Sequence, residues 1–222
     1  MLMMKRRSKQ SGVTLIELMI GMLLGLIVTG IAISMYISTL GITRQTNNTV
    51  RLGHELRASL DLITKDIRRA GYWNGSNIAS SPHASVIDQD LPLMVFTASA
   101  PTAAATDGDC VVLSYDFNRD GLTAVREILA YRLASSAIQS LYVASSSASS
   151  GVDCTITGDW NDVTDPSFVE ITTLNFSLIP SGVASFAAAS VRAIEIEIQG
   201  EVVSDDNIVR QLVEEVRIRN DI

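Results

Sequence analysis

An uncharged apolar segment near the N-terminus constrains this chain more than any other feature. No Asp, Glu, Lys or Arg occurs among the 26 residues from Leu18 to Thr43. As a helix rising 1.5 Å per residue, this segment would extend about 39 Å, which exceeds the roughly 30 Å hydrocarbon core of a bilayer. The sequence therefore predicts a membrane-spanning helix, with a transmembrane half at 13–43.

The charges around this segment predict its orientation. Four positive residues precede it: Lys5, Arg6, Arg7 and Lys9. The positive-inside rule keeps this flank in the cytoplasm and places the rest of the chain on the far side of the membrane. The net charge of the whole chain is −7, so the part beyond the basic flank is strongly acidic. Such a body is a poor ligand for phosphate backbones, and we expect no specific nucleic-acid partner.

The junction before the apolar segment lies at Ser11-Gly12, and Glu17 follows closely. A carboxylate inside a membrane costs about 2.5 to 3.5 kcal/mol on insertion scales, so it normally has a partner. One interpretation is that Glu17 reaches the headgroups at the interface. The other is that cleavage after Gly12 frees the α-amino group of Val13, which then pairs with Glu17 of a neighbouring copy.

The order Gly12-Val13-Thr14-Leu15-Ile16-Glu17 behind a basic leader resembles the N-terminus of the type IV pilin superfamily, which includes the pseudopilins of type II secretion. The resemblance implies a prepilin leader at 1–12 that prepilin peptidase removes between Gly12 and Val13, with methylation of the new amine. It assigns Glu17 to subunit assembly. It also implies a single-pass protein of the bacterial inner membrane, with a cytoplasmic N-terminus and a periplasmic C-terminal domain, that later joins a pilus at the cell surface. Val13 departs from the phenylalanine that is usual there.

Within that superfamily, four segments are similar to the PilW-type minor pilins: Glu17–Gly21, Asp66–Trp73, Asp116–Leu133 and Val216–Asn220. This similarity implies a minor pilin that primes pilus assembly in a tip complex with other minor pilins and the major pilin. Twitching motility, adhesion or DNA uptake would follow from the filament. A J-type minor pseudopilin of type II secretion is the alternative within the superfamily.

Beyond the apolar segment, hydrophobic residues recur at steps of three and four, which is the period of one helix face. These residues are Leu52, Leu56, Leu60, Ile63, Ile67 and Ala70. Gly71 is a plausible stop, so the pattern predicts a continuous helix over 14–70 and a stem at 13–71. Gly21 and Gly25 form G-x-x-x-G, which allows close packing of neighbouring helices. The alternative is that these glycines only loosen the helix.

From residue 72 to 222 the pattern predicts a β-rich globular domain and an overall α+β, pilin-like fold, in which the long helix packs on an antiparallel sheet. We expect strands near 93–97, 110–115, 127–133, 141–143, 169–178, 191–199 and 213–219. Polar residues alternate with Ile194, Ile196 and Ile198, as in a sheet that has one buried face and one solvent-exposed face. Two segments of low complexity, 97–106 and 144–151, are expected to be exposed loops.

The chain has two cysteines, Cys110 and Cys154. In an exported chain one disulfide between them is the simplest interpretation, and two unpaired buried thiols are the alternative. The cysteines and the two histidines lack the clustered spacing of a zinc site.

The segment Asp116-Phe-Asn118-Arg-Asp120-Gly121, followed by Glu127, matches the calcium-loop pattern D-x-[DN]-x-[DN]-G-x5-E. Its flanks are strand-like rather than helical, and a β-hairpin with an Asp-Gly turn is the alternative. If calcium binds, we expect Asp116, Asn118 and Asp120 as ligands, and Glu127 is a fourth and least certain ligand. We assign no metal or other cofactor from the sequence, and a calcium-dependent module at a pilus tip remains an alternative function.

No nucleophile elbow, phosphate loop or dinucleotide fingerprint occurs in the chain. His54 falls on the predicted helix and His83 in a serine-rich segment, neither with an evident catalytic partner. The sequence therefore predicts a structural subunit and not an enzyme.

Overall fold

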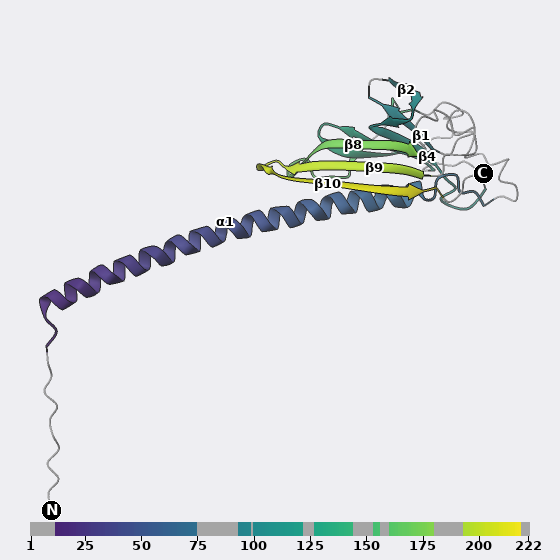
Figure 1. The fold of residues 1–222 in the computed structure, drawn as a ribbon. Helices are drawn as coiled ribbons and strands as arrows, with labels where there is room; N and C mark the ends of the chain where they lie inside the picture. The colour runs from purple at the N-terminus through teal and green to yellow at the C-terminus, as the bar shows by residue number, and fades with distance from the viewer. Residues whose placement is uncertain are drawn as a thin grey trace, which may run out of the picture. The chain divides into compact units, whose positions relative to one another are not determined.

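The computed structural model describes residues 12–74, 93–98, 100–121, 127–143, 153–155, 160–179 and 193–218. The chain divides into two compact units, Met1–Asn47 and Asn48–Ile222. One α-helix, α1 (Leu15–Ile67), has 53 residues and contributes to both units (Figure 1). Its bounds agree with the predicted helix over 14–70 to within three residues, and the α+β, pilin-like fold class is confirmed.

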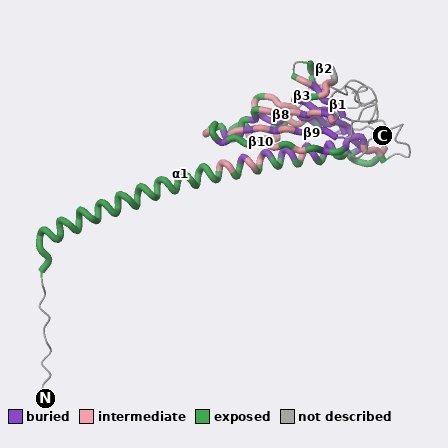
Figure 2. Tube along the Cα trace, in the orientation of Figure 1, coloured by how far each residue is buried: buried purple, intermediate pink, exposed green. Residues whose placement is uncertain are grey.

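The part of α1 that belongs to the second unit buries the apolar stripe expected from the sequence. Leu52, Leu56, Ile63 and Ile67 are fully buried, and the burial along this stretch repeats with the helix period (Figure 2). After the helix, Gly71 has a φ of 76°, a left-handed conformation that glycine adopts without steric cost. Its N–H donates to the carbonyl of Ser114 at 2.8 Å. Gly71 is therefore the C-terminal stop that the sequence indicated.

Polar contacts at the surface accompany this apolar interface. Arg51 pairs with Asp165 at 2.9 Å, and its guanidinium lies 3.7 Å from the ring centre of Phe168. Arg68 pairs with Glu214 at 3.3 Å. Exposed pairs of this kind contribute roughly 0 to 1 kcal/mol each, so the buried stripe carries most of the attachment.

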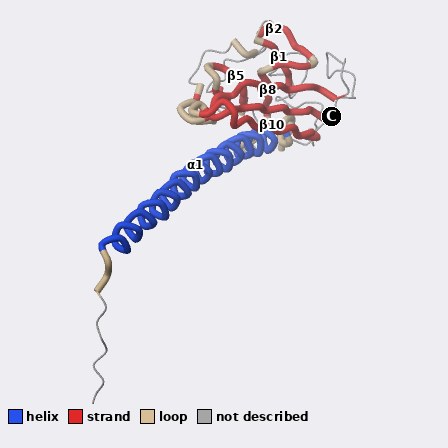
Figure 3. Tube along the Cα trace, turned by 60° about the vertical axis from the view of Figure 1, so that its left-hand side comes forward, coloured by secondary structure: helices blue, strands red, loops and turns tan. Residues whose placement is uncertain are grey.

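Two antiparallel sheets complete the second unit (Figure 3). Their strands are β1 (Leu93–Thr97), β2 (Ala100–Ala105), β3 (Asp107–Gly108), β4 (Cys110–Ser114), β5 (Ile128–Ala134), β6 (Ala137–Val143), β7 (Asn161–Asp162), β8 (Val169–Ile179), β9 (Ala193–Val202) and β10 (Asp205–Arg217). The larger sheet has the order β2-β1-β4-β5-β6-β7, and the smaller has the order β10-β9-β8-β3.

The smaller sheet covers the helix with one face, as its alternating sequence predicted. Ile194, Ile196 and Ile198 of β9 are fully buried in the main core, and Glu195 between them is exposed. Ile198 lies opposite Leu174 of β8 on one side and Leu212 of β10 on the other. These cross-strand neighbours form a continuous apolar surface against the helix stripe, within one cluster of buried side chains.

The central strands of the larger sheet bury side chains on both faces. In β1, Val95 belongs to the main core, whereas Phe96 belongs to a second cluster on the opposite face. Cys110 and Cys154 lie in this second cluster and are joined by a disulfide, with their Cα atoms 6.5 Å apart. The covalent bridge expected for an exported chain therefore holds residues 153–155 against the sheet.

The segment 97–106 departs from its expected loop structure. It contains the strand β2, which pairs with β1 at the edge of the larger sheet, Val95 opposite Ala105 and Thr97 opposite Ala100. Ladder hydrogen bonds come from the backbone, so this short run of alanine, proline and threonine joins a sheet edge although it has no large apolar side chain. The other low-complexity segment, 144–151, lies outside the described residues.

The chain passes from the smaller sheet to the larger one between β3 and β4. Gly108 in β3 pairs with Phe176 of β8, and Cys110 two residues later pairs with Phe96 of β1. A Cβ atom at position 108 would clash with the backbone of Phe96 and lie 2.6 Å from its carbonyl carbon. Glycine is required at this crossing because the two sheets approach each other through backbone atoms.

Candidate functional site

The predicted cleavage junction lies just before the start of α1. Gly12 and Val13 are exposed and precede the helix, and Thr14 caps it. The Thr14 hydroxyl accepts a hydrogen bond from the Glu17 N–H at 3.4 Å, and its carbonyl accepts one from Leu18 at 3.2 Å. A peptidase would meet a non-helical peptide bond here, because the ordered helix begins only at Leu15.

Glu17 has a local role that the sequence analysis missed. Thr14 and Glu17 have the spacing of a capping box, T-x-x-E, and Glu17 lies in the first turn of α1. The positive end of the helix macrodipole stabilises a carboxylate at this position. The T-x-x-E spacing of Thr14 and Glu17 is sufficient to predict this role from the sequence.

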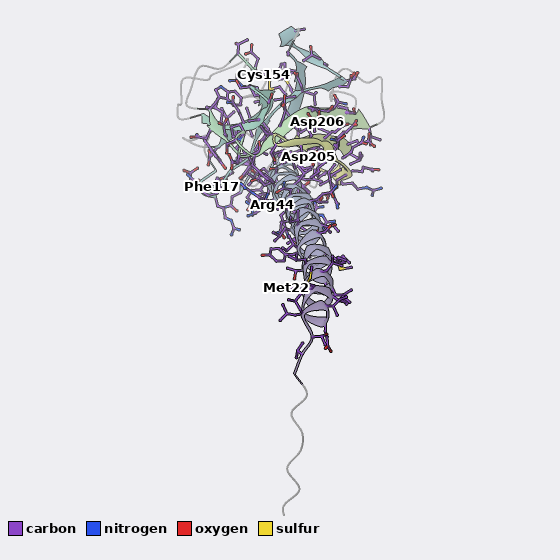
Figure 4. All side chains as sticks on the ribbon, turned by 90° about the vertical axis from the view of Figure 1, so that its left-hand side faces the viewer. Met22, Arg44, Phe117, Cys154, Asp205 and Asp206 are labelled. Atoms are coloured by element: carbon purple, nitrogen blue, oxygen red, sulfur yellow. A yellow bond between two sulfur atoms is a disulfide. The ribbon has the colours of Figure 1, made fainter. Side chains whose placement is uncertain are left out.

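The apolar half of α1 is exposed throughout. Every residue from 12 to 47 is exposed, including Leu15 at 78% and Leu26 at 75% (Figure 2). Side chains project around this half, with Met22 among them (Figure 4). By length and composition it is the one described helix able to cross a membrane. So large an apolar surface requires lipid or other apolar chains as its surroundings.

Gly21 and Gly25 have no packing role within the described part of the chain. A Cβ atom at either position would meet nothing within 4 Å. Thr29, one turn further, satisfies its hydroxyl by donating to the Gly25 carbonyl at 2.7 Å. The two glycines therefore leave a flat helix surface that a second helix is able to approach.

A hydrogen-bonded carboxylate fixes the end of α1 in the core of the second unit. Asp66 is buried and accepts hydrogen bonds from the hydroxyls of Tyr131 at 2.6 Å and Tyr115 at 3.2 Å. Burial, followed by the charge of Asp66, raises the pKa of Tyr115 to about 12. The same two causes raise the pKa of Tyr131 further. Both tyrosines are therefore neutral donors at physiological pH.

The calcium-pattern segment connects the antiparallel strands β4 and β5, and its described residues bring three carboxylates together. Oxygen atoms of Asp116, Asp120 and Glu127 lie within 4.8 Å of one another. Glu127, the least certain ligand from sequence, points inward and is buried. Asn118 instead orients its neighbour, because its side-chain oxygen accepts a hydrogen bond from the Asp120 N–H at 2.9 Å.

Of the two histidines, only His54 lies within the described residues. His54 is exposed on α1, and His83 lies outside the described ranges.

The N-terminal region and the fold define a class of pilin-like proteins that depend on prepilin peptidase. A model of the prokaryotic N-terminal methylation motif matches residues 7–33. A second model, prepilin peptidase-dependent protein B, matches residues 45–218, which is most of the chain. The chain therefore belongs to the prepilin peptidase-dependent protein B family. Comparison with curated proteins and with solved structures finds no significant match.

Proposed function

We propose that this protein is a minor pilin of the PilW type, which helps to prime type IV pilus assembly in a complex at the filament tip. The observation that carries this proposal is the complete exposure of the apolar half of α1, together with the methylation motif that matches residues 7–33. Twitching motility, adhesion or DNA uptake would then be properties of the filament, and the chain itself would act as a structural subunit without catalytic activity.

The apolar half would have two successive environments. Before assembly it would span the inner membrane, with the basic leader in the cytoplasm and the β-rich unit in the periplasm. On assembly it would leave the lipid and pack among the helices of other minor pilins and the major pilin. Gly21 and Gly25 support this step, because close helix approach compensates for the lost lipid contacts.

Cleavage between Gly12 and Val13 would place a new amine at the start of the helix. The positive end of the helix macrodipole repels a positive charge there, and the carboxylate of Glu17 offsets this repulsion. In a bundle of parallel subunits, the amine of one chain would pair with Glu17 of its neighbour in a medium of low dielectric constant. This pairing would set the axial position of each subunit relative to the next.

The variant Glu17→Ala tests the assembly role directly. We expect leader removal to continue and incorporation into sheared pili to fall strongly, as measured by mass spectrometry and immunoblotting of pilus fractions. Thr14→Ala is the matched control, because it removes the helix cap while keeping the carboxylate. Normal incorporation of Glu17→Ala, or equal loss in Thr14→Ala, would contradict charge pairing.

Deletion of the gene tests the choice between a pilus and a type II secretion system. A minor pilin predicts fewer surface pili with normal enzyme secretion, and restoration of pili by the intact chain. A loss of secretion with normal pili would instead identify a minor pseudopilin.

A further inference from the structure

Three carboxylates in the β4–β5 hairpin have no part in the proposed assembly role. Oxygen atoms of Asp116, Asp120 and Glu127 all lie within 4.8 Å of one another. Asp116 and Glu127 are each 1% exposed, whereas Asp120 is exposed. Carboxylates this close repel one another in their ionised form, and burial increases the repulsion. Positive charge at the centre of the cluster would remove that cost.

The two carboxylate oxygens of Asp116 differ in their hydrogen bonding, and this difference indicates a bound cation. Its Oδ2 accepts hydrogen bonds from the backbone N–H groups of Asn74 and Gly121, each at 3.1 Å. Its Oδ1 is also buried, but among the described residues it has no hydrogen-bond partner. A buried charged oxygen without a partner is costly, and such groups normally coordinate a ligand or an ion.

We propose that Asp116, Asp120 and Glu127 bind a calcium ion. All of the clustered donor atoms are carboxylate oxygens, which calcium prefers, whereas zinc and related metals favour nitrogen and sulfur. Magnesium requires a rigid octahedral shell and gives up its water reluctantly. The D-x-N-x-D-G sequence is the loop type that supplies calcium with several oxygens from one tight turn.

The hairpin and the calcium loop are compatible interpretations of the same residues. Tyr115 donates its backbone N–H to the Glu127 carbonyl at 3.0 Å, so strand pairing places Glu127 beside Asp116. In the described part of the connection between the strands, φ is positive at Arg119 (64°) and Gly121 (76°), which is a conformation typical of tight turns. The pairing of β4 with β5 therefore brings the last carboxylate of the motif to the site. In an EF-hand the second helix has this role.

The site is connected to the residues that follow α1. Asp116 donates its N–H to the Tyr72 carbonyl at 2.8 Å, and the Trp73 indole donates to the Gly121 carbonyl at 2.9 Å. An ion held by Asp116 would therefore stabilise both the hairpin and the exit of the helix. Calcium should raise the melting temperature of the protein for this reason.

Calorimetry on the full-length protein in detergent, after calcium removal with EGTA, tests the proposal. We expect calcium to bind with a dissociation constant of about 10⁻⁴ to 10⁻³ M, as in extracellular calcium modules, and magnesium at least about tenfold more weakly. Calcium at about ten times that constant should raise the melting temperature by roughly 3 °C or more. The absence of both signals, or equal binding of magnesium, would overturn the assignment.

Isosteric variants locate the ion. Asp120→Asn changes an exposed side chain and should fold normally while weakening calcium binding about tenfold or more. Asp116→Asn keeps an acceptor for the two backbone N–H groups but loses the charge, and it should also lose the calcium response. Glu195→Gln, an exposed change on β9, is the charge-matched control and should bind as the unmodified chain does. Unchanged binding in Asp120→Asn would place the ion elsewhere.

Terbium luminescence gives an independent location. Terbium replaces calcium at oxygen sites, and Trp73 lies beside the loop through its bond to Gly121. Excitation of tryptophan should produce terbium emission that calcium displaces. Trp73→Phe should lose this emission while calorimetric calcium binding persists, and emission that survives the substitution would contradict the proposed position.

Discussion

The carboxylate of Asp66, one residue before the end of α1, accepts a hydrogen bond of 2.6 Å from the hydroxyl of Tyr131 in β5. Both side chains are buried, and 65 residues separate them in the chain. This bond joins the helix to the larger sheet at a point where apolar packing alone would not fix the register of the two elements.

Tyr131→Phe should therefore destabilise the protein without disturbing the shape of the core. The substitution leaves a buried carboxylate with one donor fewer, so we expect the free energy of unfolding to fall by about 1 to 3 kcal/mol. Chemical denaturation measures the change. Tyr142→Phe is the control, because Tyr142 is 45% exposed and its loss should have a smaller effect. Equal effects of the two substitutions would contradict the role assigned to the bond.

Alkaline pH should weaken the same region. The pKa of Tyr115 is raised to about 12 by burial and by Asp66, above its ordinary value of 10.0. Below pH 10 the tyrosine is neutral in both states and its contribution is complete. Above pH 10 only the unfolded state loses the proton, so stability should fall as the pH rises through the interval from 10 to 12. Melting curves across this interval should show a shallower fall for Tyr115→Phe.

Removal of the disulfide should have a large effect on stability. Cys110 and Cys154 are 44 residues apart in sequence, and closing a loop of that length contributes about 4 kcal/mol in the chain-entropy model. The double variant Cys110→Ala with Cys154→Ala should therefore unfold at much lower denaturant concentration. Addition of reductant to the unmodified protein should reproduce the loss. A chain that is equally stable with and without reductant would contradict this prediction.

Gly12→Leu should block leader removal. The proposed peptidase cleaves a junction that ends in glycine, and a bulky side chain there would obstruct access to the peptide bond. Intact-mass measurement should find the full leader on the variant, whereas the unmodified chain should begin at Val13. Gly41→Leu is the matched control, since a side chain at that position meets nothing within 4 Å. A mature N-terminus elsewhere than Val13 in the unmodified chain would contradict the assigned site.

The sequence predicted the parts of the fold that depend on local periodicity. The helix stripe from Leu52 to Ile67 and the alternation in β9 each have the repeat of the element they form. Continuous apolar runs, such as Leu93–Phe96, do not show which side chain faces which layer, and the second buried face was missed for that reason. The strand β2 was missed because its pairing uses backbone groups.

The candidate sites also differ in whether the sequence alone predicts them. The methylation motif is contiguous, so sequence alone located it. The bond between Asp66 and Tyr131 depends on two distant segments meeting, which no spacing rule encodes. Glu127 is an intermediate case, because the motif includes it but only the structure shows that its side chain is buried beside Asp116.

The crossing at Gly108 has a consequence for the evolution of this domain. The two sheets lie close together at Gly108 because this residue has no Cβ atom. A Cβ atom there would overlap with the backbone of Phe96. Relatives that join β3 to β4 in this manner should retain glycine there even where their loops diverge freely. A lineage that replaced it would have to lengthen the connection or move the layers apart.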